Sequence, residues 1–373
     1  MRILIAFRSF NKHGGISRYV AELAERFVKE HEIHLLTTDY DHEVPDLTVH
    51  KKPMIRKPFW LQILSNSYYS TKYAKKIKDE LDIDLVSSNG AESLFCDIVT
   101  MHSCHRAWVK YYRSWGWLED IKGAVNPVNR VVLPIEKRVI EKESKKIISV
   151  SEGVKREILE NYDVPEDKII VIPNGVDIDE FKPDEERKKS IRERYGIKED
   201  EVILMFSGYE FKRKGLRYII EALPQVKGEV KLLVIGKDNP KPYKELALTL
   251  GVSDKIIFAG FVPDISEYYA ASDVFVFPTA YEAFSLATLE AVASGLPILA
   301  TKVNGTEELI EEGYNGFFIK RDPADIAEKI NILIEDESLR EQMGKNARKT
   351  AENYSWDKIA VMTMDVYEEM MRR

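Results

Sequence analysis

The stretch that decides the fold is Val274-Phe-Val-Phe-Pro-Thr-Ala-Tyr-Glu-Ala-Phe-Ser-Leu-Ala-Thr-Leu-Glu-Ala-Val-Ala-Ser-Gly295. Its first residues, Val274–Phe277, form an apolar run that a proline ends, and this pattern predicts a buried strand. After Ala283, apolar side chains recur with the spacing of a helix. These side chains are Leu286, Leu289 and Val292. Two glutamates therefore straddle the predicted helix start, with Glu282 in the loop and Glu290 on the helix.

This placement matters because ligands of open α/β sheets bind at the carboxyl ends of the strands. The free N–H groups at a helix start also favour an anion such as phosphate. A glutamate in such a loop can contact a polar group of a ligand, and one farther along the helix can reach hydroxyl groups. The pair suits a nucleotide or a phosphorylated sugar, but two solvated glutamates near an ordinary helix start would show the same spacing.

The composition is that of a globular protein, and the length of the chain indicates more than one hydrophobic core. A chain of 373 residues is expected to form two domains of roughly 180 residues each. Residues 1–8 hold too short an apolar stretch for a signal peptide, and no segment approaches the roughly 20 apolar residues of a membrane-spanning helix. The two cysteines, Cys96 and Cys104, are too few for a disulfide framework. These features favour a cytoplasmic protein with reduced, structural thiols.

Short β-branched runs alternate with helical segments along the chain, which is the pattern of parallel sheets built from βαβ units. The strands predicted in the first half are Arg2–Phe7, Glu32–Thr38, Leu85–Ser88, Asp97–Met101, Lys146–Val150 and Ile169–Ile172. Those predicted in the second half are Val202–Ser207, Lys231–Ile235, Ile256–Ala259, Val274–Phe277, Ile298–Thr301 and Gly316–Ile319. A turn-rich segment, Pro173–Pro183, separates the two sets and reads as a domain link. The predicted fold is α/β, with two Rossmann-like, doubly wound domains facing each other across a cleft.

The two halves differ in charge. Residues 1–150 hold 24 Lys and Arg against 19 Asp and Glu, and residues 151–373 hold 31 against 43, so the net charges are +5 and −12. Residues 51–78 and 102–118 both mix basic side chains with aromatic ones such as Trp60 and Trp108. Such segments can lie on an anionic membrane surface or bind a polyanion, or they can form a solvated face with buried anchors. Nucleic acid is a weaker candidate, because the sequence pI is about 5.7 and no recognised binding motif occurs.

Two further loops contain residues that suit phosphate. The loop that ends in Gly14 and Gly15 lets the backbone come close to a ligand, and the helix predicted after it supplies N–H donors. The loop Gly208–Gly215 follows a predicted strand and carries three cations, Lys212, Arg213 and Lys214. Taken alone, either loop could be an ordinary turn or a solvated segment, and neither matches the dinucleotide fingerprint or the P-loop.

In combination these residues resemble glycosyltransferase family 4, the retaining, nucleotide-sugar-dependent enzymes of the GT-B fold. The strongest part is the block 272–298, which is similar to the family's Glu-x7-Glu signature with its flanks. Supporting matches, in chain order, are His13–Tyr19, Ser149–Gly153, Ile172–Asp177, Gly208–Gly215 and Gly305–Gly316. The resemblance covers essentially the whole chain. It implies an acceptor domain at 1–175, a donor domain at 176–354, and a last helix at 355–373, capped by Ser355, that crosses back to the first domain.

The resemblance also implies roles for individual residues. Arg213 and Lys214 would hold the diphosphate, and Glu282 would contact the transferred sugar. Glu290 would bind the ribose hydroxyls, and His102 would touch the sugar. The other implied donor contacts are Gly14 and Gly15 at the diphosphate, Ala283, Phe284, Ser285 and Leu286 at the sugar and distal phosphate, and Val262 at the base. The residues implied on the acceptor or membrane side are Trp60, His105, Trp108 and Arg113.

Some positions depart from the family pattern. Tyr209 stands where many members carry Arg, and Arg213 is expected to substitute for it. Ala283 and Ser285 replace the usual glycines around the first glutamate. These changes leave the identity of the sugar open.

The implied reaction is transfer from a UDP- or GDP-sugar to a hydroxyl of a glycan or lipid-linked glycan, with no further cofactor. A double displacement would need a carboxylate at the anomeric carbon, and no residue of the first half clearly supplies one. Front-face attack, with the departing phosphate taking the acceptor's proton, is therefore the expected mechanism. Metal is not expected, since the Asp-x-Asp pairs occur at three scattered places: Asp39/Asp41, Asp82/Asp84 and Asp177/Asp179. The alternatives are a GT-B epimerase, a phosphorylase, and a non-catalytic protein that binds sugar nucleotides.

Overall fold

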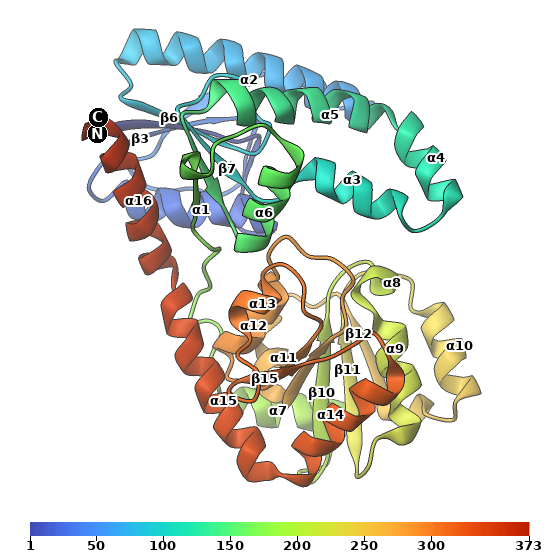
Figure 1. The fold of residues 1–373 in the computed structure, drawn as a ribbon. Helices are drawn as coiled ribbons and strands as arrows, with labels where there is room; N and C mark the ends of the chain where they lie inside the picture. Colours follow the sequence, from blue (N-terminus) through green and yellow to red (C-terminus); the bar gives the residue numbers. More distant parts are fainter. Residues whose placement is uncertain (373) are drawn as a thin grey trace. The chain divides into compact units, whose positions relative to one another are not determined.

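The computed structural model describes the backbone of residues 1–372 and the side chains of residues 1–116 and 121–372. The chain forms two compact units. Unit 1 comprises Met1–Gly175 together with the chain from Trp356 onward, and unit 2 comprises Val176–Ser355. Each unit is built around one parallel sheet (Figure 1).

The sheet of unit 1 has the strand order β5-β3-β1-β6-β7-β8-β9, and every pair of neighbours is parallel. Its strands are β1 (Arg2–Ala6), β3 (Glu32–Thr37), β5 (Thr48–Lys51), β6 (Leu85–Asn89), β7 (Ile98–Met101), β8 (Lys146–Ser149) and β9 (Ile169–Val171). Two short strands, β2 (Ser9–Phe10) and β4 (Asp39–Tyr40), pair separately.

The helices of unit 1 lie on both faces of its sheet. They are α1 (Gly15–Phe27), α2 (Phe59–Leu81), α3 (His105–Arg113), α4 (Trp117–Val125), α5 (Pro127–Arg138), α6 (Glu152–Asn161) and α16 (Trp356–Arg372). A π-helical turn, Val139–Glu143, follows α5, and a short 3₁₀ turn spans Glu166–Lys168. Helices α1 and α16 pack together on one face, and α2 and α5 lie side by side on the other (Figure 1).

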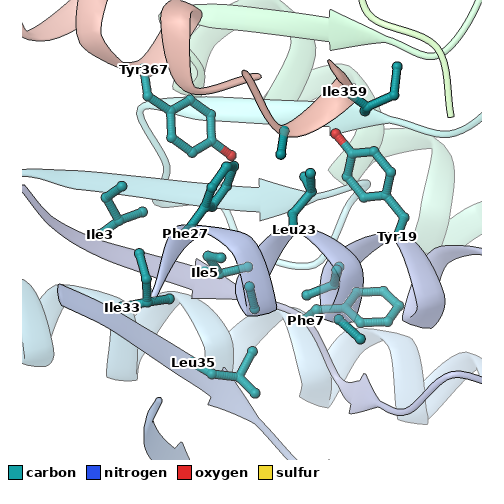
Figure 2. Close-up of a cluster of buried hydrophobic side chains, with 14 of the residues drawn as sticks. Ile3, Ile5, Phe7, Tyr19, Leu23, Phe27, Ile33, Leu35, Ile359 and Tyr367 are labelled. Carbon is teal, nitrogen blue, oxygen red and sulfur yellow. The ribbon is translucent and has the colours of Figure 1, made fainter. Parts of the chain in front are cut away.

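The core of unit 1 joins the last helix to the first. Figure 2 shows Tyr367 and Ile359 of α16 beside Phe27, Leu23 and Tyr19 of α1, above the side chains of β1 and β3. All of these side chains are buried. Because α16 contributes to this core, the end of the chain is part of the same hydrophobic unit as its beginning.

The sheet of unit 2 has the strand order β12-β11-β10-β13-β14-β15 and is also parallel throughout. Its strands are β10 (Val202–Ser207), β11 (Val230–Ile235), β12 (Ile256–Gly260), β13 (Val274–Phe277), β14 (Ile298–Ala300) and β15 (Gly316–Phe318). Its helices are α7 (Glu185–Tyr195), α8 (Phe211–Lys214), α9 (Leu216–Ala222), α10 (Lys241–Thr249), α11 (Ser266–Ala271), α12 (Leu286–Ala293), α13 (Thr306–Leu309), α14 (Pro323–Glu335) and α15 (Glu337–Ala351). Short 3₁₀ turns span Leu223–Gln225, Ser253–Lys255 and Glu352–Tyr354.

All strands predicted from the sequence are present, and each of their ends agrees within one residue. The prediction missed the two-residue strands β2 and β4, and it missed β5, a half-exposed edge strand with the polar sequence Thr-Val-His-Lys. It also placed the start of α12 too early. The helix begins at Leu286 rather than directly after Ala283, because Ser285 acts as its N-cap.

Both sheets contain a topological switch point. In unit 1 the chain runs from β1 outward through β3 to β5 and then returns to the other side of β1 as β6. In unit 2 it runs from β10 through β11 to β12 and returns to the other side of β10 as β13. Ligands of doubly wound sheets bind at the carboxyl ends of the two strands that flank this reversal. Ligand contacts are therefore expected in the loops after β1 and β6 of unit 1 and in those after β10 and β13 of unit 2.

Candidate functional site

The loops after β10 and β13 are joined at the switch point of unit 2. The backbone N–H of Ala280 donates to the carbonyl of Arg213 at 3.0 Å. Gly215, at the end of α8, has a φ of 84°, and a Cβ atom there would lie 2.2 Å from the carbonyl oxygen of Pro278. A side chain at position 215 would therefore push the two loops apart.

Glu282, in the loop after β13, contacts both cations of the loop after β10. Its Oε1 lies 2.5 Å from Lys214 Nζ and 3.2 Å from Arg213 Nη1. The hydroxyl of Thr279 donates to the same oxygen at 2.7 Å. The Glu282 side chain is only 9% exposed, and a carboxylate buried this deeply needs such partners. The sequence predicted that these three charged residues lie near one ligand, and the structure brings them into direct contact.

Lys214 is nearly as buried as its partner. Its ammonium lies 4.9 Å from the centre of the Phe277 ring, within the range of a cation–π interaction. Burial lowers the pKa of Lys214, and the negative charge of Glu282 opposes this effect. The ammonium is thus held at the base of the site between an aromatic face and a carboxylate.

Arg213 is bound at both ends of its guanidinium. Nη1 donates to the carbonyl of Tyr281 at 2.5 Å, and Nε and Nη2 donate to Glu210 Oε2 at 3.0 and 2.8 Å. The Glu210 side chain is exposed and its residue has a left-handed φ of 57°. An anionic ligand at this site would compete with Glu210 for the guanidinium.

The start of α12 completes this part of the site. Ser285 caps the helix, since its hydroxyl accepts the N–H of Thr288 at 3.2 Å. Phe284 and Ser285 are buried, whereas Ala283 and Leu286 are partly exposed. The first N–H groups of any helix lack acceptors within the helix, so this segment presents donors next to the Lys214 and Glu282 pair.

Gly305, in the loop after β14, sets the position of this segment. Its φ is 79°, and a Cβ atom there would lie 2.7 Å from Phe284 Cα and 3.0 Å from the Ser285 nitrogen. The absence of a side chain at position 305 therefore allows the loop before α12 to lie where it does.

Glu290 and Val262 occupy the remaining predicted donor positions of unit 2. Glu290 is half-buried on α12, next to the buried hydroxyl of Tyr269. Burial raises the pKa of Tyr269, and the carboxylate of Glu290 raises it further. Val262 is buried in the loop that follows β12, beside the exposed ring of Phe261.

In unit 1, Gly14 and Gly15 lie at the start of α1, at the switch point. Both are exposed, and Gly14 is the N-cap residue, with φ −119° and ψ 150°. A Cβ atom at Gly14 would meet only the Ser17 side chain, at 3.6 Å. The open space around these glycines is compatible with the predicted approach of a ligand, and no contact requires glycine at position 14.

His102 follows β7 directly and packs inside unit 1. Its Nε2 lies 3.1 Å from Asn89 Oδ1, and its ring meets that of Tyr19 edge-on at 4.8 Å. Burial lowers the pKa of His102 to about 3. The ring is therefore neutral at physiological pH, and the amide oxygen of Asn89 fixes the proton on Nε2.

His105 has a local structural role. It is the first residue of α3, where its N–H donates to Glu136 Oε1 at 2.7 Å and its ring nitrogen Nε2 lies 3.0 Å from Asn129 Oδ1. Glu136 of α5 thereby caps α3. The resemblance implies an acceptor-side position for His105, and these contacts show that the residue also joins the start of α3 to α5.

The other residues predicted on the acceptor or membrane side lie on two helices, α2 and α3. Trp60 is exposed near the start of α2. Trp108 is half-buried on α3, where its ring contacts Tyr111 and Tyr112. Arg113 is exposed at the end of the same helix. Within the part of the chain that the structure describes, no helix is both long enough and apolar enough to cross a bilayer.

The Asp-x-Asp pairs have local roles. Asp39 accepts from Arg56 at 2.6 Å, and Asp84 accepts the N–H of Arg2 at 2.7 Å. Asp177 accepts the backbone N–H groups of Asp179 and Glu180 at 3.0 and 2.9 Å. The three pairs thus stabilise three different segments.

The sequence did not single out several residues at these sheet edges. In unit 2 these are Glu210, Thr279 and the position-setting Gly305. In unit 1 they are Arg8, which is partly exposed, and the buried residues Lys52, Asn66 and Glu92, and the four form a network at the carboxyl edge of the sheet. Among the second group, only Arg8 carried a local signal, because it directly follows the predicted strand Arg2–Phe7. Lys52 follows β5, which the sequence did not predict, and Asn66 lies on α2.

Comparison with known proteins agrees with this geometry. Residues 187–350 match the family described as Glycosyl transferases group 1, and residues 13–180 match Glycosyltransferase Family 4. An uncharacterized glycosyltransferase of Methanocaldococcus jannaschii is 30% identical over 383 residues, which cover 96% of each chain.

Two solved structures share the fold over nearly their whole length. One is WaaG, a glycosyltransferase involved in lipopolysaccharide biosynthesis, with a TM-score of 0.79 and 21% identity over 98% of this chain and 99% of that one. The other is Anabaena Alr3699/HepE in complex with UDP-glucose, with a TM-score of 0.75 and 19% identity over 99% of this chain and 100% of that one. With two parallel Rossmann-like sheets, matches in both halves and a relative similar along its full length, the chain belongs to glycosyltransferase family 4 and has the GT-B fold.

Proposed function

We propose that this protein transfers a sugar, with retention of configuration, from a UDP- or GDP-sugar to a hydroxyl group of a glycan or lipid-linked glycan. The observation that carries this proposal is the contact of Lys214 and Arg213 with Glu282 beside the start of α12. Buried cations and helix N–H groups at a switch point suit a diphosphate. A carboxylate among them suits the hydroxyl groups of the sugar.

In the proposed donor complex, the diphosphate lies between the start of α12 and the side chains of Arg213 and Lys214. Glu282 uses the oxygen that faces away from Lys214 to accept a hydroxyl of the transferred sugar. Glu290 accepts the ribose hydroxyls, and the backbone at Val262 meets the base. The complex of Alr3699/HepE with UDP-glucose, which has the same fold, supports a nucleotide-sugar donor.

The proposed mechanism is front-face attack without a metal ion. The acceptor oxygen bonds to the anomeric carbon on the side from which the diphosphate departs, and the leaving phosphate takes the acceptor's proton. Negative charge builds up on the diphosphate, so donors that are already in place lower the barrier. Arg213, Lys214 and the N–H groups before α12 are the groups available for this task. His102, being neutral, would serve as a hydrogen-bonding contact to the sugar rather than as a charge.

We assign the acceptor to unit 1 and propose that this unit lies on an anionic membrane surface. Along α2 the exposed side chains of Trp60, Leu64 and Tyr68 recur every four residues and form an apolar stripe. Lysines continue the same face at Lys72 and Lys76, both of which are exposed. An apolar stripe followed by basic residues is typical of helices that lie in a membrane interface. The lipopolysaccharide role of WaaG, which shares the fold, is compatible with such an acceptor.

A thermal-shift screen of the full chain against UDP, GDP and ADP, each free and as a sugar conjugate, tests the proposal. A nucleotide that binds the native state raises its stability by about 2.7 kcal/mol at a concentration of 100 times Kd. We expect one nucleotide to raise Tm in the wild type and to have less effect in Lys214→Ala. If no nucleotide raises Tm, the donor assignment is wrong. If a sugar nucleotide binds but no acceptor extract yields transfer, a non-catalytic binding protein is favoured.

A further inference from the structure

Unit 1 contains the same charge arrangement that marks the donor site of unit 2. Arg8 follows β1, and Glu92 lies in the loop after β6, on the two sides of the switch point. Their charged side chains form an ion pair, in which Arg8 Nη1 and Glu92 Oε1 are 3.4 Å apart. In unit 2 the cation Lys214 follows the corresponding central strand, and Glu282 follows the strand across the switch. The two sheets thus place a cation and a carboxylate at equivalent positions.

Glu92 is held from below by a polar network. Its Oε2 accepts from Asn66 Nδ2 of α2 at 2.5 Å. The side-chain oxygen of Asn66 accepts in turn from Lys52 Nζ, which also donates to the hydroxyl of Thr38 at 3.2 Å. Lys52 directly follows β5 and Thr38 directly follows β3. The network therefore connects the carboxyl ends of the four adjacent strands β5, β3, β1 and β6.

Burying these charged and polar groups at the edge of the sheet costs free energy of desolvation. Lys52, Asn66 and Glu92 are all buried. Burial lowers the pKa of Lys52 to about 8 and raises the pKa of Glu92, although the charge of Arg8 opposes the second effect. Well-packed apolar residues stabilise such positions as well as buried charges do, or better. Buried ionisable groups that gather at the ligand-binding edge of a sheet are therefore more typical of a site than of a core.

Arg8 is the member of the network that a ligand can reach. Its side chain is 35% exposed, whereas that of Glu92 is 8% exposed. Its carbonyl accepts the N–H groups of Thr38 and Asp39 at 3.1 and 3.0 Å, so its backbone is fixed. The 3.4 Å separation from Glu92 is longer than an ordinary hydrogen bond, which leaves the guanidinium able to take a stronger partner. The network contains two cations, Arg8 and Lys52, and one carboxylate, Glu92. Its excess of positive charge favours the binding of an anion.

We propose that Arg8 binds a phosphate group carried by the acceptor. Glu92, Asn66 and Lys52 are positioning residues that hold its guanidinium from below. The planar fork of Arg suits two oxygens of one phosphate. This inference rests on the proposed function, since that function assigns the donor to unit 2 and the acceptor to unit 1.

The test is a calorimetric titration of the full chain with glucose 6-phosphate, in the wild type and in Arg8→Gln. The protein is first saturated with UDP, so that Arg213 and Lys214 cannot bind the added phosphate. We expect saturable binding to the wild type, at least about tenfold weaker binding to Arg8→Gln, and weak binding of plain glucose to both. UDP affinity should be equal in the two proteins. Dihexanoyl phosphatidylglycerol, used as a monomer in a parallel arm, distinguishes a lipid headgroup from a soluble sugar phosphate as the source of the group.

Two further variants complete the design. Arg138→Gln removes an exposed arginine of α5 that pairs with Glu143, and it should bind the phosphate probes like the wild type. Arg8→Lys keeps a charge without the planar fork, so it should bind with intermediate affinity even if Arg8→Gln proves unstable. The proposal is wrong if neither phosphate probe binds the wild type, or if both bind Arg8→Gln equally well. It is also wrong if UDP affinity falls as much as affinity for the probe, because Arg8 would then belong to the donor site. Absence of binding of both UDP and GDP to the wild type is a separate result and would count against the proposed function.

Discussion

Lys214 Nζ lies 2.5 Å from Glu282 Oε1, and this contact bridges the two loops at the switch point of unit 2. Arg213 and Thr279 donate to the same carboxylate oxygen. A single buried carboxylate therefore holds two cations in place before any ligand arrives. If the cations had to move into place during the reaction, that reorganisation would add to the activation barrier. Cations that are already in place can therefore stabilise a leaving anion at no such cost.

Replacement of Lys214 by Ala should slow transfer at least about a hundredfold at saturating donor, because one well-placed donor to developing charge is lost. Glu282 keeps Arg213 and Thr279 as partners, so the fold should persist, as circular dichroism and Tm would show. The matched control is Lys212→Ala, which removes an exposed lysine of the same helix. A Lys214→Ala enzyme whose turnover stays within a few-fold of the wild type would contradict the assignment.

Treatment with EDTA should leave transfer largely intact. In the proposed mechanism, Arg213, Lys214 and the helix N–H groups neutralise the departing diphosphate, so no added cation is needed for that task. The measurement compares initial rates before and after EDTA, with Mg²⁺ or Mn²⁺ restored in a third sample. Complete loss of activity that only added metal restores would show that the charge stabilisation is assigned to the wrong groups.

The elements and the donor signature could be predicted because their information is local. Apolar runs such as Val274–Phe277 specify a buried strand by themselves, and every predicted strand is present. The edge strand Thr48–Lys51 escaped prediction because it is polar and only half-buried. The helix start was predicted too early for a different reason. Phe284 continues the apolar pattern of the helix, but the hydroxyl of Ser285 accepts a backbone N–H and makes Ser285 the N-cap, so the helix begins after it.

The contacts between distant segments had no such signal. Nothing in the sequence near Lys52 indicates that it shares Asn66 with Glu92, since strand order alone brings their loops to one edge. The same holds for Gly305, whose importance comes from the backbone of Phe284 beside it. Sequence patterns identified which residues suit a donor, and the fold determined which of them touch.

As the pH is lowered, the free energy of unfolding should decrease more steeply for the wild type than for the variant His102→Gln. The pKa of His102 is about 3 in the folded chain because of burial, whereas an unfolded histidine titrates near its ordinary value of about 6.5. Between these values the unfolded state binds the proton, so the stability that is fully present above pH 6.5 is lost as the pH falls. From pH 7 to pH 5 the wild type should lose about 2 kcal/mol more than the variant.

Urea unfolding at the two pH values measures this difference. Gln can still donate to Asn89, so the variant should fold at pH 7. Equal pH dependence in both proteins would mean that His102 is more accessible to protons than its packing indicates.

Membrane contact should depend on the apolar stripe of α2. The side chains of Trp60 and Tyr68 are 36% and 60% exposed on this helix. Their double replacement by Ala should reduce co-sedimentation with phosphatidylglycerol vesicles several-fold, and added salt should weaken binding of the wild type. Leu248→Ala removes an exposed apolar side chain of unit 2 and is the control. If the wild type shows no salt-sensitive binding, the proposed membrane surface is wrong.

Replacement of Gly305 by Ala should weaken donor binding through the backbone alone. A methyl group at this position would lie 2.7 Å from Phe284 Cα and 3.0 Å from the Ser285 nitrogen, so the segment before α12 must move. Gly313 has nearly the same left-handed φ, 77° against 79°, but nothing lies within 4 Å of its added methyl group. A positive φ costs an alanine about 1–2 kcal/mol, so both variants should be less stable than the wild type, and the close contacts add to the cost at Gly305. Only Gly305→Ala should raise the Kd of the bound nucleotide, by at least about tenfold. Because both variants place an alanine at a positive φ, a rise in the calorimetric Kd that occurs only in Gly305→Ala reports the position of the helix start rather than general destabilisation. Equal Kd values would mean that the N–H groups before α12 do not contact the donor.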